Sequence, residues 1–145
     1  MMTEAFTLRR AGPEDIQGCD YVVNDWIDAT PWKPRTFSHD EIERMILEAL
    51  PVREIFFVGD PVEAYLSFDP VGAKIGALYC RNPGNGVGKA LLDHVRKRRD
   101  FVWLTSDEPN TRAQAFYRRE GFTDAGFEGP HPPEPLRELR MEWRR

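Results

Sequence analysis

The chain has 145 residues, of which 41% are hydrophobic and 30% are charged, so we expect one globular domain over residues 1–145. Its net charge of -4 argues against nonspecific nucleic-acid binding, which needs clustered positive charge. No basic leader and no apolar run of about 20 residues appears, so we expect neither export nor a membrane span. Cys19 and Cys80 lie far apart and match no metal-ligand spacing, which favours reduced thiols in a cytoplasmic protein without a metal.

The first part of the chain predicts a strand and then a helix. Phe6 and Leu8 alternate with polar residues, as they do in a strand with one wet face. The run Gly12-Pro13-Glu14-Asp15 is typical of a helix start. Apolar residues then recur at helical spacing, so we expect one buried face, with polar Asp20 and Asn24 on other faces. The expected buried face consists of Ile16, Cys19, Val23, Trp26 and Ile27.

A loop and a second helix should follow. The stretch Thr30–Arg35 holds two prolines, which block both helix and central strand, so we expect a loop there. Ser38 and Glu41 have the spacing of a capping box, in which each side chain accepts from the other residue's backbone N–H. An apolar stripe behind that box predicts the helix: Ile42, Met45, Ile46 and Ala49.

The middle of the chain predicts three successive strands, and the remainder alternates strands with helices. The three strands are Glu54–Val58, Val62–Phe68 and Lys74–Cys80, separated by turn residues. Apolar spacing from Val87 to Val95 predicts a helix, Phe101 to Leu104 a buried strand, and Ala113 to Tyr117 a last helix that Gly121 can end. A strand should begin at Phe122, and another should contain alternating Leu139, Met141 and Trp143.

The glycine-rich turn from Arg81 to Lys89 carries the first functional signal. Gly84, Gly86 and Gly88 let consecutive N–H groups point inward, and the helix that follows adds its positive end, which suits a pyrophosphate. A nucleoside-triphosphate loop would need glycine at Pro83, and a dinucleotide fingerprint would need glycine at Lys89. The alternative that the glycines serve only chain reversal stays open at this point.

The run from Asn110 to Phe122, which contains Ala-x-x-Phe-Tyr-x-x-x-Gly-Phe, is the second signal. In order and separation, the two segments resemble motifs A and B of the GCN5-related N-acetyltransferases (GNATs). The specific matches cover only Leu78 to Leu92 and Asn110 to Phe122. The glycine motif can open at Arg81 or at Pro83, and we prefer Pro83, which removes one N–H donor.

The resemblance implies an α/β (α+β) fold, with a central mixed, mostly antiparallel, twisted sheet of about six or seven strands and about four flanking helices. It implies an acyl-CoA-dependent N-acyltransferase, using acetyl-CoA and no metal. The acetyl group would pass by direct attack, in a ternary complex, to a primary amine of a small molecule or peptide. The alternative is a catalytically silent module that binds acyl-CoA. We expect a monomer or homodimer.

The resemblance also implies where the cofactor would lie. The strand Lys74–Cys80 would splay from its parallel neighbour Phe101–Ser106, and pantetheine would occupy the gap as a pseudo-strand. The implied cofactor-binding residues are Leu78, Tyr79, Cys80, Asn85, Gly86, Val87, Gly88, Lys89, Ala90, Asn110, Ala113, Phe116 and Tyr117.

Tyr117 is the candidate catalytic acid that would protonate the departing thiolate. Transfer from a phenol of pKa about 10 to a thiolate of about 8.5 is uphill by roughly 2 kcal/mol, so it must accompany bond cleavage. The alternative is that Tyr117 only packs beside Phe116. The general base stays open among Glu54, Glu63, Asp107, Glu108 and a water chain.

The acceptor side carries no matched motif. The resemblance implies an acceptor cleft formed by the first two helices and a late loop, with Trp26, Trp32, Phe37 and Glu128 as the substrate-binding candidates. The late loop from Glu128 to Pro135 is rich in proline and could rim a pocket. Aromatic rings together with Glu128 or Glu134 would suit a cationic or aromatic amine, although core packing explains the same residues.

Overall fold

A seven-stranded sheet in the order β1-β2-β3-β4-β5-β7-β6 forms the centre of the computed structural model, which describes residues 6–145. Its strands are β1 (Leu8–Arg10), β2 (Glu54–Val58), β3 (Ala64–Asp69), β4 (Lys74–Cys80), β5 (Phe101–Asp107), β6 (Thr123–Glu128) and β7 (Glu138–Arg144). All neighbouring strands are antiparallel except β4 and β5, which are parallel. The predicted mixed, mostly antiparallel sheet is therefore confirmed.

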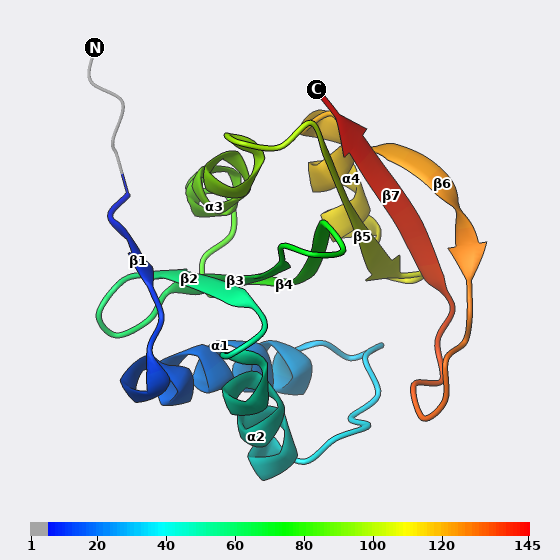
Figure 1. Cartoon of the computed structure of the whole chain (residues 1–145). Helices are drawn as coiled ribbons and strands as arrows, with labels where there is room; N and C mark the ends of the chain where they lie inside the picture. Colours follow the sequence, from blue (N-terminus) through cyan, green and yellow to red (C-terminus); the bar gives the residue numbers. More distant parts are fainter. Residues whose placement is uncertain (1–5) are drawn as a thin grey trace.

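Helices cover both faces of this sheet (Figure 1). They are α1 (Ile16–Ala29), preceded by a short 3-10 turn (Pro13–Asp15), α2 (His39–Ala49), α3 (Val87–Arg96) and α4 (Thr111–Arg119). In Figure 1, α1 and α2 lie on one side of β1–β4, and α3 lies on the opposite side. Within residues 6–145, no helix has the length and apolar character that crossing a bilayer would require.

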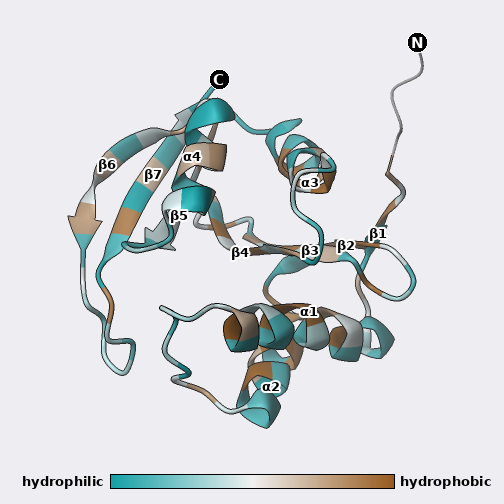
Figure 2. Ribbon diagram, turned by 180° about the vertical axis from the view of Figure 1, so that it is seen from behind, coloured by the Kyte–Doolittle hydropathy of each residue, from teal (hydrophilic) through white to brown (hydrophobic). Residues whose placement is uncertain are grey.

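Two apolar cores correspond to the two faces of the sheet. One packs α3 and α4 against the central strands, with Leu91, Leu92 and Met141 fully buried. The other packs α1 against Ile55, Phe57 and other residues of the opposite face. Figure 2 shows apolar residues gathered along β3 and where α1 meets α2. α1 and α3 are thus held by burial of one apolar stripe each.

Local signals in the sequence account for the ends of several helices. The predicted capping box is confirmed, because the Glu41 N–H donates to Ser38 Oγ at 3.1 Å and the Ser38 N–H donates to Glu41 Oε1 at 3.0 Å. Asn110 caps α4 by accepting the Ala113 N–H at 3.2 Å. Gly121 takes a left-handed φ of 93° just after α4, as its lack of a Cβ allows.

One prediction about α1 is wrong, since Asp20 and Asn24 do not lie on exposed faces. Both are buried, at 5% and 2% exposure. The loop of residues 30–38 returns over this side of α1, and Arg35 Nη1 donates to Asn24 Oδ1 at 2.8 Å. Asn24 in turn bonds to Asp20. Burial raises the pKa of Asp20, and Glu43 raises it further. This polar network ties the 30–38 loop to α1.

The sheet opens between its two parallel strands. Along β4 and β5 the register contains one paired position, Lys74 with Trp103, and Trp103 N–H donates to Ala73 O at 3.1 Å. Beyond that point the strands diverge, and β5, β7 and β6 stand at a steep angle to β1–β4 (Figure 1). The facing edges of β4 and β5 are therefore left without strand partners for most of their length.

Candidate active site

A cleft of about 1330 Å³ follows the divergence of β4 and β5. Its walls come from both strands, from α1 and α2, from the glycine turn and from α4. The apolar stripe of α2 predicted from the sequence lines it, and Met45 there is 47% exposed. The stripe therefore packs only partly and leaves an apolar wall at the cleft.

The glycine turn brings the start of α3 to one end of this cleft. Gly84 and Gly86 have left-handed φ values of 98° and 87°, and Gly86 is the N-cap residue of α3. The Val87 N–H donates to Asn85 Oδ1 at 3.1 Å, and the Ala90 N–H donates to Gly86 O at 3.0 Å.

In the first turn of α3, the N–H groups of Gly88 and Lys89 precede the first intrahelical hydrogen bond, so helix geometry leaves them open. Ala90 donates within the helix and Val87 is capped by Asn85, so neither amide is free. The available donors are therefore fewer than the run of N–H groups expected from the sequence.

Gly88 also sits where a side chain would crowd the cleft wall. A Cβ built on Gly88 would lie 3.3 Å from Phe116 Cζ and 3.6 Å from Cys80 Sγ. Glycine there lets α3 approach β4 and α4 closely, which keeps the N–H groups at the end of the cleft. Phe116, Cys80 and Gly88, three of the cofactor-binding residues that the resemblance implies, all line the cleft.

The edge of β4 that faces β5 presents backbone donors. Arg81 N–H points to β3, because it donates to Glu63 O at 2.9 Å. N–H groups alternate in direction along a strand, so those of Leu78 and Cys80 point the opposite way, toward the gap. Among residues 6–145, β5 offers no paired position at this level. An amide-bearing chain could add here as an extra strand.

Tyr117 reaches the same cleft from α4. Its side chain is 8% exposed and lies between Phe116 and Phe122, with ring centroids 5.3 Å and 5.5 Å away. No hydrogen-bond partner for its hydroxyl occurs among residues 6–145. Burial raises the pKa of Tyr117, and Tyr79 and Cys80 raise it further. The hydroxyl is therefore a protonated donor at neutral pH.

The structure brings together most of the residues singled out from the sequence. The following line the cleft: Trp26, Phe37, Leu78, Tyr79, Cys80, Gly86, Gly88, Lys89, Asn110, Ala113, Phe116 and Tyr117. Outside the lining are Asn85, Val87, Ala90, Trp32 and Glu128. Val87 is a core residue, Trp32 packs edge-on against Trp26 at 5.6 Å, and Glu128 Oε1 lies 3.6 Å from His131 Nε2.

Among the four carboxylates considered as a general base, Asp107 alone lines the cleft. Glu108 is exposed and pairs with Arg137, and Glu63 accepts from Asn85 Nδ2 at 2.6 Å. Sequence patterns did not single out Lys33, Tyr65 or Glu138, which also line the cleft. The alternation of β3 and β7 could have placed Tyr65 and Glu138 on a common face, but nothing local placed Lys33. Within residues 6–145, His, Cys, Asp and Glu form no group of three suited to holding a metal.

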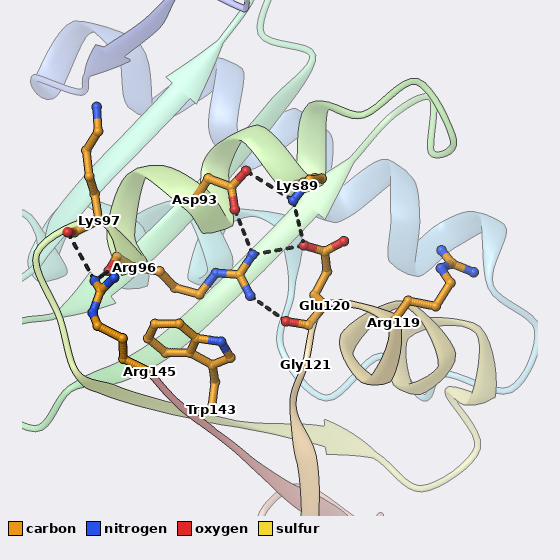
Figure 3. Close-up of a pocket in the computed structure, with 9 residues that line it drawn as sticks. All are labelled: Lys89, Asp93, Arg96, Lys97, Arg119, Glu120, Gly121, Trp143 and Arg145. Carbon is orange, nitrogen blue, oxygen red and sulfur yellow. Dashed lines mark hydrogen bonds and ion pairs between the residues drawn. The ribbon is translucent and has the colours of Figure 1, made fainter.

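A second hollow, of about 500 Å³, adjoins the cleft and shares three lining residues with it, and its charges largely pair with one another (Figure 3). Arg96 is 7% exposed, and it donates to Asp93 Oδ1 at 2.7 Å and to Glu120 Oε1 at 2.9 Å. Lys89 Nζ lies 3.3 Å from Glu120 Oε1. Arg119 stands apart from this network in Figure 3 and lines both hollows. We therefore assign a structural role to this ion-pair network. Arg119, which is outside the network, contributes its charge to the cleft.

Several solved structures share this arrangement over nearly the full chain. YjaB from Escherichia coli superposes with a TM-score of 0.79 at 20% identity, covering 97% of this chain and 98% of its own. A GCN5-related N-acetyltransferase from Rhodopseudomonas palustris gives 0.79 at 16% identity, covering 100% and 99%. YncA from Salmonella typhimurium, solved with acetyl-CoA, gives 0.71 at 17% identity, covering 97% and 94%.

Comparisons by sequence alone do not detect this relationship. No protein-family model matches the chain, and no curated protein sequence does so at a significant level. The sheet and the helices nevertheless superpose on these structures over nearly the whole chain. The chain therefore has the fold of the GCN5-related N-acetyltransferases.

Proposed function

We propose that the chain is an acyl-CoA-dependent N-acyltransferase that moves an acetyl group from acetyl-CoA to a primary amine. The opening of β4 from β5 after a single paired position carries this proposal. It creates one cleft that joins free backbone donors at the start of α3 to the hydroxyl of Tyr117. A cofactor with a diphosphate, a chain of amides and a thioester matches that order of groups.

The residues present fit such a cofactor. The N–H groups of Gly88 and Lys89, at the positive end of α3, would hold the diphosphate. Arg112 and Arg119 line the cleft and supply positive charge. The amides of Leu78 and Cys80 would hold the pantetheine chain. Acetyl-CoA supplies the electrophilic thioester carbonyl.

Tyr117 is the proposed proton donor. In the transfer, a bond forms between the amine nitrogen and the acetyl carbon, and the bond from that carbon to sulfur breaks. The nitrogen loses one proton and the sulfur gains one. The Tyr117 hydroxyl, which is unpartnered within residues 6–145 and kept protonated by burial, can supply the proton to sulfur. Solvent then restores the tyrosine.

Two measurements test the proposal in order. Isothermal titration should show coenzyme A binding to the wild-type chain, and release of free thiol from acetyl-CoA should increase when primary amines are added. Absence of binding would overturn the cofactor assignment. Binding without amine-dependent thiol release, or with hydrolysis alone, would favour the catalytically silent module instead.

A further inference from the structure

Three carboxylates line the part of the cleft where β5 stops and β7 begins. Asp107 is the last residue of β5 and pairs in register with Glu138, the first residue of β7. Glu134 comes from the loop of residues 129–137 that precedes β7. All three side chains line the cleft. We call this group the carboxylate pocket: Asp107, Glu134 and Glu138.

One cation of the chain enters the carboxylate pocket. Lys33 Nζ lies 2.9 Å from Asp107 Oδ2 and 3.6 Å from Glu134 Oε2. Glu138 has no ion-pair partner within residues 6–145, and it accepts only from Thr105 Oγ1 at 2.6 Å. Three negative groups therefore face one positive group, so the pocket has an excess of negative charge.

The charged groups of the carboxylate pocket are partly buried, so water screens its excess of negative charge less than it would on the surface. The side chains of Lys33 and Asp107 are 12% and 18% exposed. Tyr79 forms the adjoining wall and packs against Trp26 at 5.3 Å between ring centroids. After burial, the charges of Asp107, Glu134 and Glu138 are what raise the pKa of Tyr79, so all three act on one point of the cleft.

Within residues 6–145, one buried hydroxyl without a partner lines the cleft beside these strands. Ser106, which precedes Asp107, is 6% exposed and its Oγ is buried without a hydrogen bond. Leaving a buried polar group unbonded is unfavourable, so a ligand or water that bonds to it would stabilise the site.

We propose that the carboxylate pocket binds the second ammonium group of a linear diamine or longer polyamine, whose other amine is the acetyl acceptor. This inference rests on the proposed function. Lys33 is itself an alkylammonium on a four-carbon stem, so its position demonstrates that the pocket accommodates such a group beside Asp107. The aromatic wall of Tyr79 and Trp26 would cover the methylene chain between the two nitrogens.

The two nitrogens of the acceptor must reach two places at once, so the carbon chain between them has to span the distance from Tyr117 to the carboxylate pocket. The reacting nitrogen is neutral and is acylated beside Tyr117, and the second nitrogen keeps its proton and its charge throughout. A monoamine of equal length lacks that second charge and cannot use the carboxylate pocket. Selectivity for diamines over monoamines is therefore the direct measure of the pocket.

The test compares 1,4-diaminobutane with n-butylamine as acceptors in the thiol-release assay with acetyl-CoA. We expect the wild-type chain to prefer the diamine in kcat/KM by about tenfold or more, as partly buried charge pairs commonly confer. In Glu134→Gln, and in Glu138→Gln alone, the preference should fall toward parity through a higher diamine KM. Glu138→Gln keeps the size of the side chain and can still accept from Thr105, so it guards against misfolding.

Lys33→Met distinguishes diamine binding by the carboxylate pocket from a role of Lys33 that only holds the 30–38 loop in place. Removing the internal cation makes the carboxylate pocket more negative, so the KM of the diamine should fall while that of n-butylamine stays unchanged. If Lys33 only holds the 30–38 loop in place, both KM values should rise instead. Asp124→Asn is the matched control, because Asp124 pairs with Arg118 on the surface and both lie outside the cleft lining. It should leave the preference at the wild-type value.

The outcomes distinguish this inference from the proposed function. Equal use of diamine and monoamine by the wild type, or a preference that survives in the carboxylate variants, overturns the inference and leaves the acyltransferase intact. If no amine is acetylated, thermal unfolding with 1,4-diaminobutane decides. A rise in Tm for the wild type that is lost in the carboxylate variants supports the pocket and overturns the proposed function, and no rise overturns the pocket.

Discussion

The chemistry proposed for Tyr117 depends on the hydroxyl of a buried residue that lines the cleft and that, among residues 6–145, is bonded to no other group. Tyr117→Phe removes only that oxygen and keeps the packing against Phe116 and Phe122. We expect turnover to fall by about 100-fold, the usual contribution of a general acid, with coenzyme A affinity unchanged. Thiol release under saturating acetyl-CoA and titration calorimetry measure the two quantities.

Tyr21→Phe is the matched control, because Tyr21 is on α1, 52% exposed and outside the cleft lining. It should leave turnover unchanged. The pH profile gives a second check. Burial raises the pKa of Tyr117 above the ordinary tyrosine value of about 10, so the acid stays protonated through neutral and mildly alkaline pH. A loss below about tenfold in Tyr117→Phe, or a tyrosine titration near pH 8 in kcat, would contradict the assignment.

At the scale of single elements, the turn between β4 and α3 is the part on which cofactor binding depends. Gly86 has a φ of 87°, and a Cβ there would meet no atom closer than 3.8 Å. Gly86→Ala therefore costs mainly backbone strain, about 1–2 kcal/mol of unfolding free energy. The shift that relieves this strain moves the N–H groups of Gly88 and Lys89. We expect coenzyme A affinity to fall by about tenfold, as losing a charge-assisted hydrogen bond does.

Gly126→Ala provides the comparison for that prediction. Gly126 lies in β6 with a φ of 103° and has open space where a Cβ would be placed. Both variants should lose similar stability in urea denaturation. Because Gly126 lies outside the cleft lining, its variant should bind coenzyme A like the wild type in calorimetry. Equal weakening of binding in both variants would mean that the turn has no special role.

At the scale of the whole molecule, Arg96 connects parts of the chain that are far apart in sequence. From α3, it donates to Glu120 O at 2.6 Å just after α4, and its guanidinium lies 5.3 Å from the ring of Trp143 in β7 (Figure 3). Arg96→Met would leave the carboxylate of Glu120, whose side chain is 14% exposed, with the weaker contact to Lys89 alone. We expect a loss of about 3 kcal/mol in unfolding free energy.

The surface pair of Arg118 and Asp124 is the reference for that loss. Their nitrogen and oxygen lie 2.9 Å apart, but both side chains are nearly half exposed. Arg118→Met should therefore cost less than about 1 kcal/mol. Urea denaturation of both variants, compared at equal m-values, measures the difference. Similar small losses would show that the buried network around Arg96 is not a major tie between the halves of the sheet.

The sequence by itself determined the features that depend on neighbouring residues. The capping box of Ser38 and Glu41, the cap at Asn110 and the left-handed Gly121 follow from bonds or conformations within a few residues. The strand and helix periods likewise identified the elements and, with the two motifs, the fold. The helical spacing from Ala113 to Tyr117 likewise predicted that Tyr117 lies on the last helix.

Only the tertiary structure decided which residues from distant parts of the sequence contact one another. Asp20 and Asn24 are polar residues on a face that α1 alone would expose, and they are buried because the 30–38 loop folds back with Arg35. Lys33 meets Asp107 across 74 positions of sequence, so no local pattern could place them together. Loops rich in proline have no hydrophobic periodicity, so their sequence does not predict which way their side chains point. Lys33 and Glu134 belong to such loops, and long-range packing therefore brings them to the cleft.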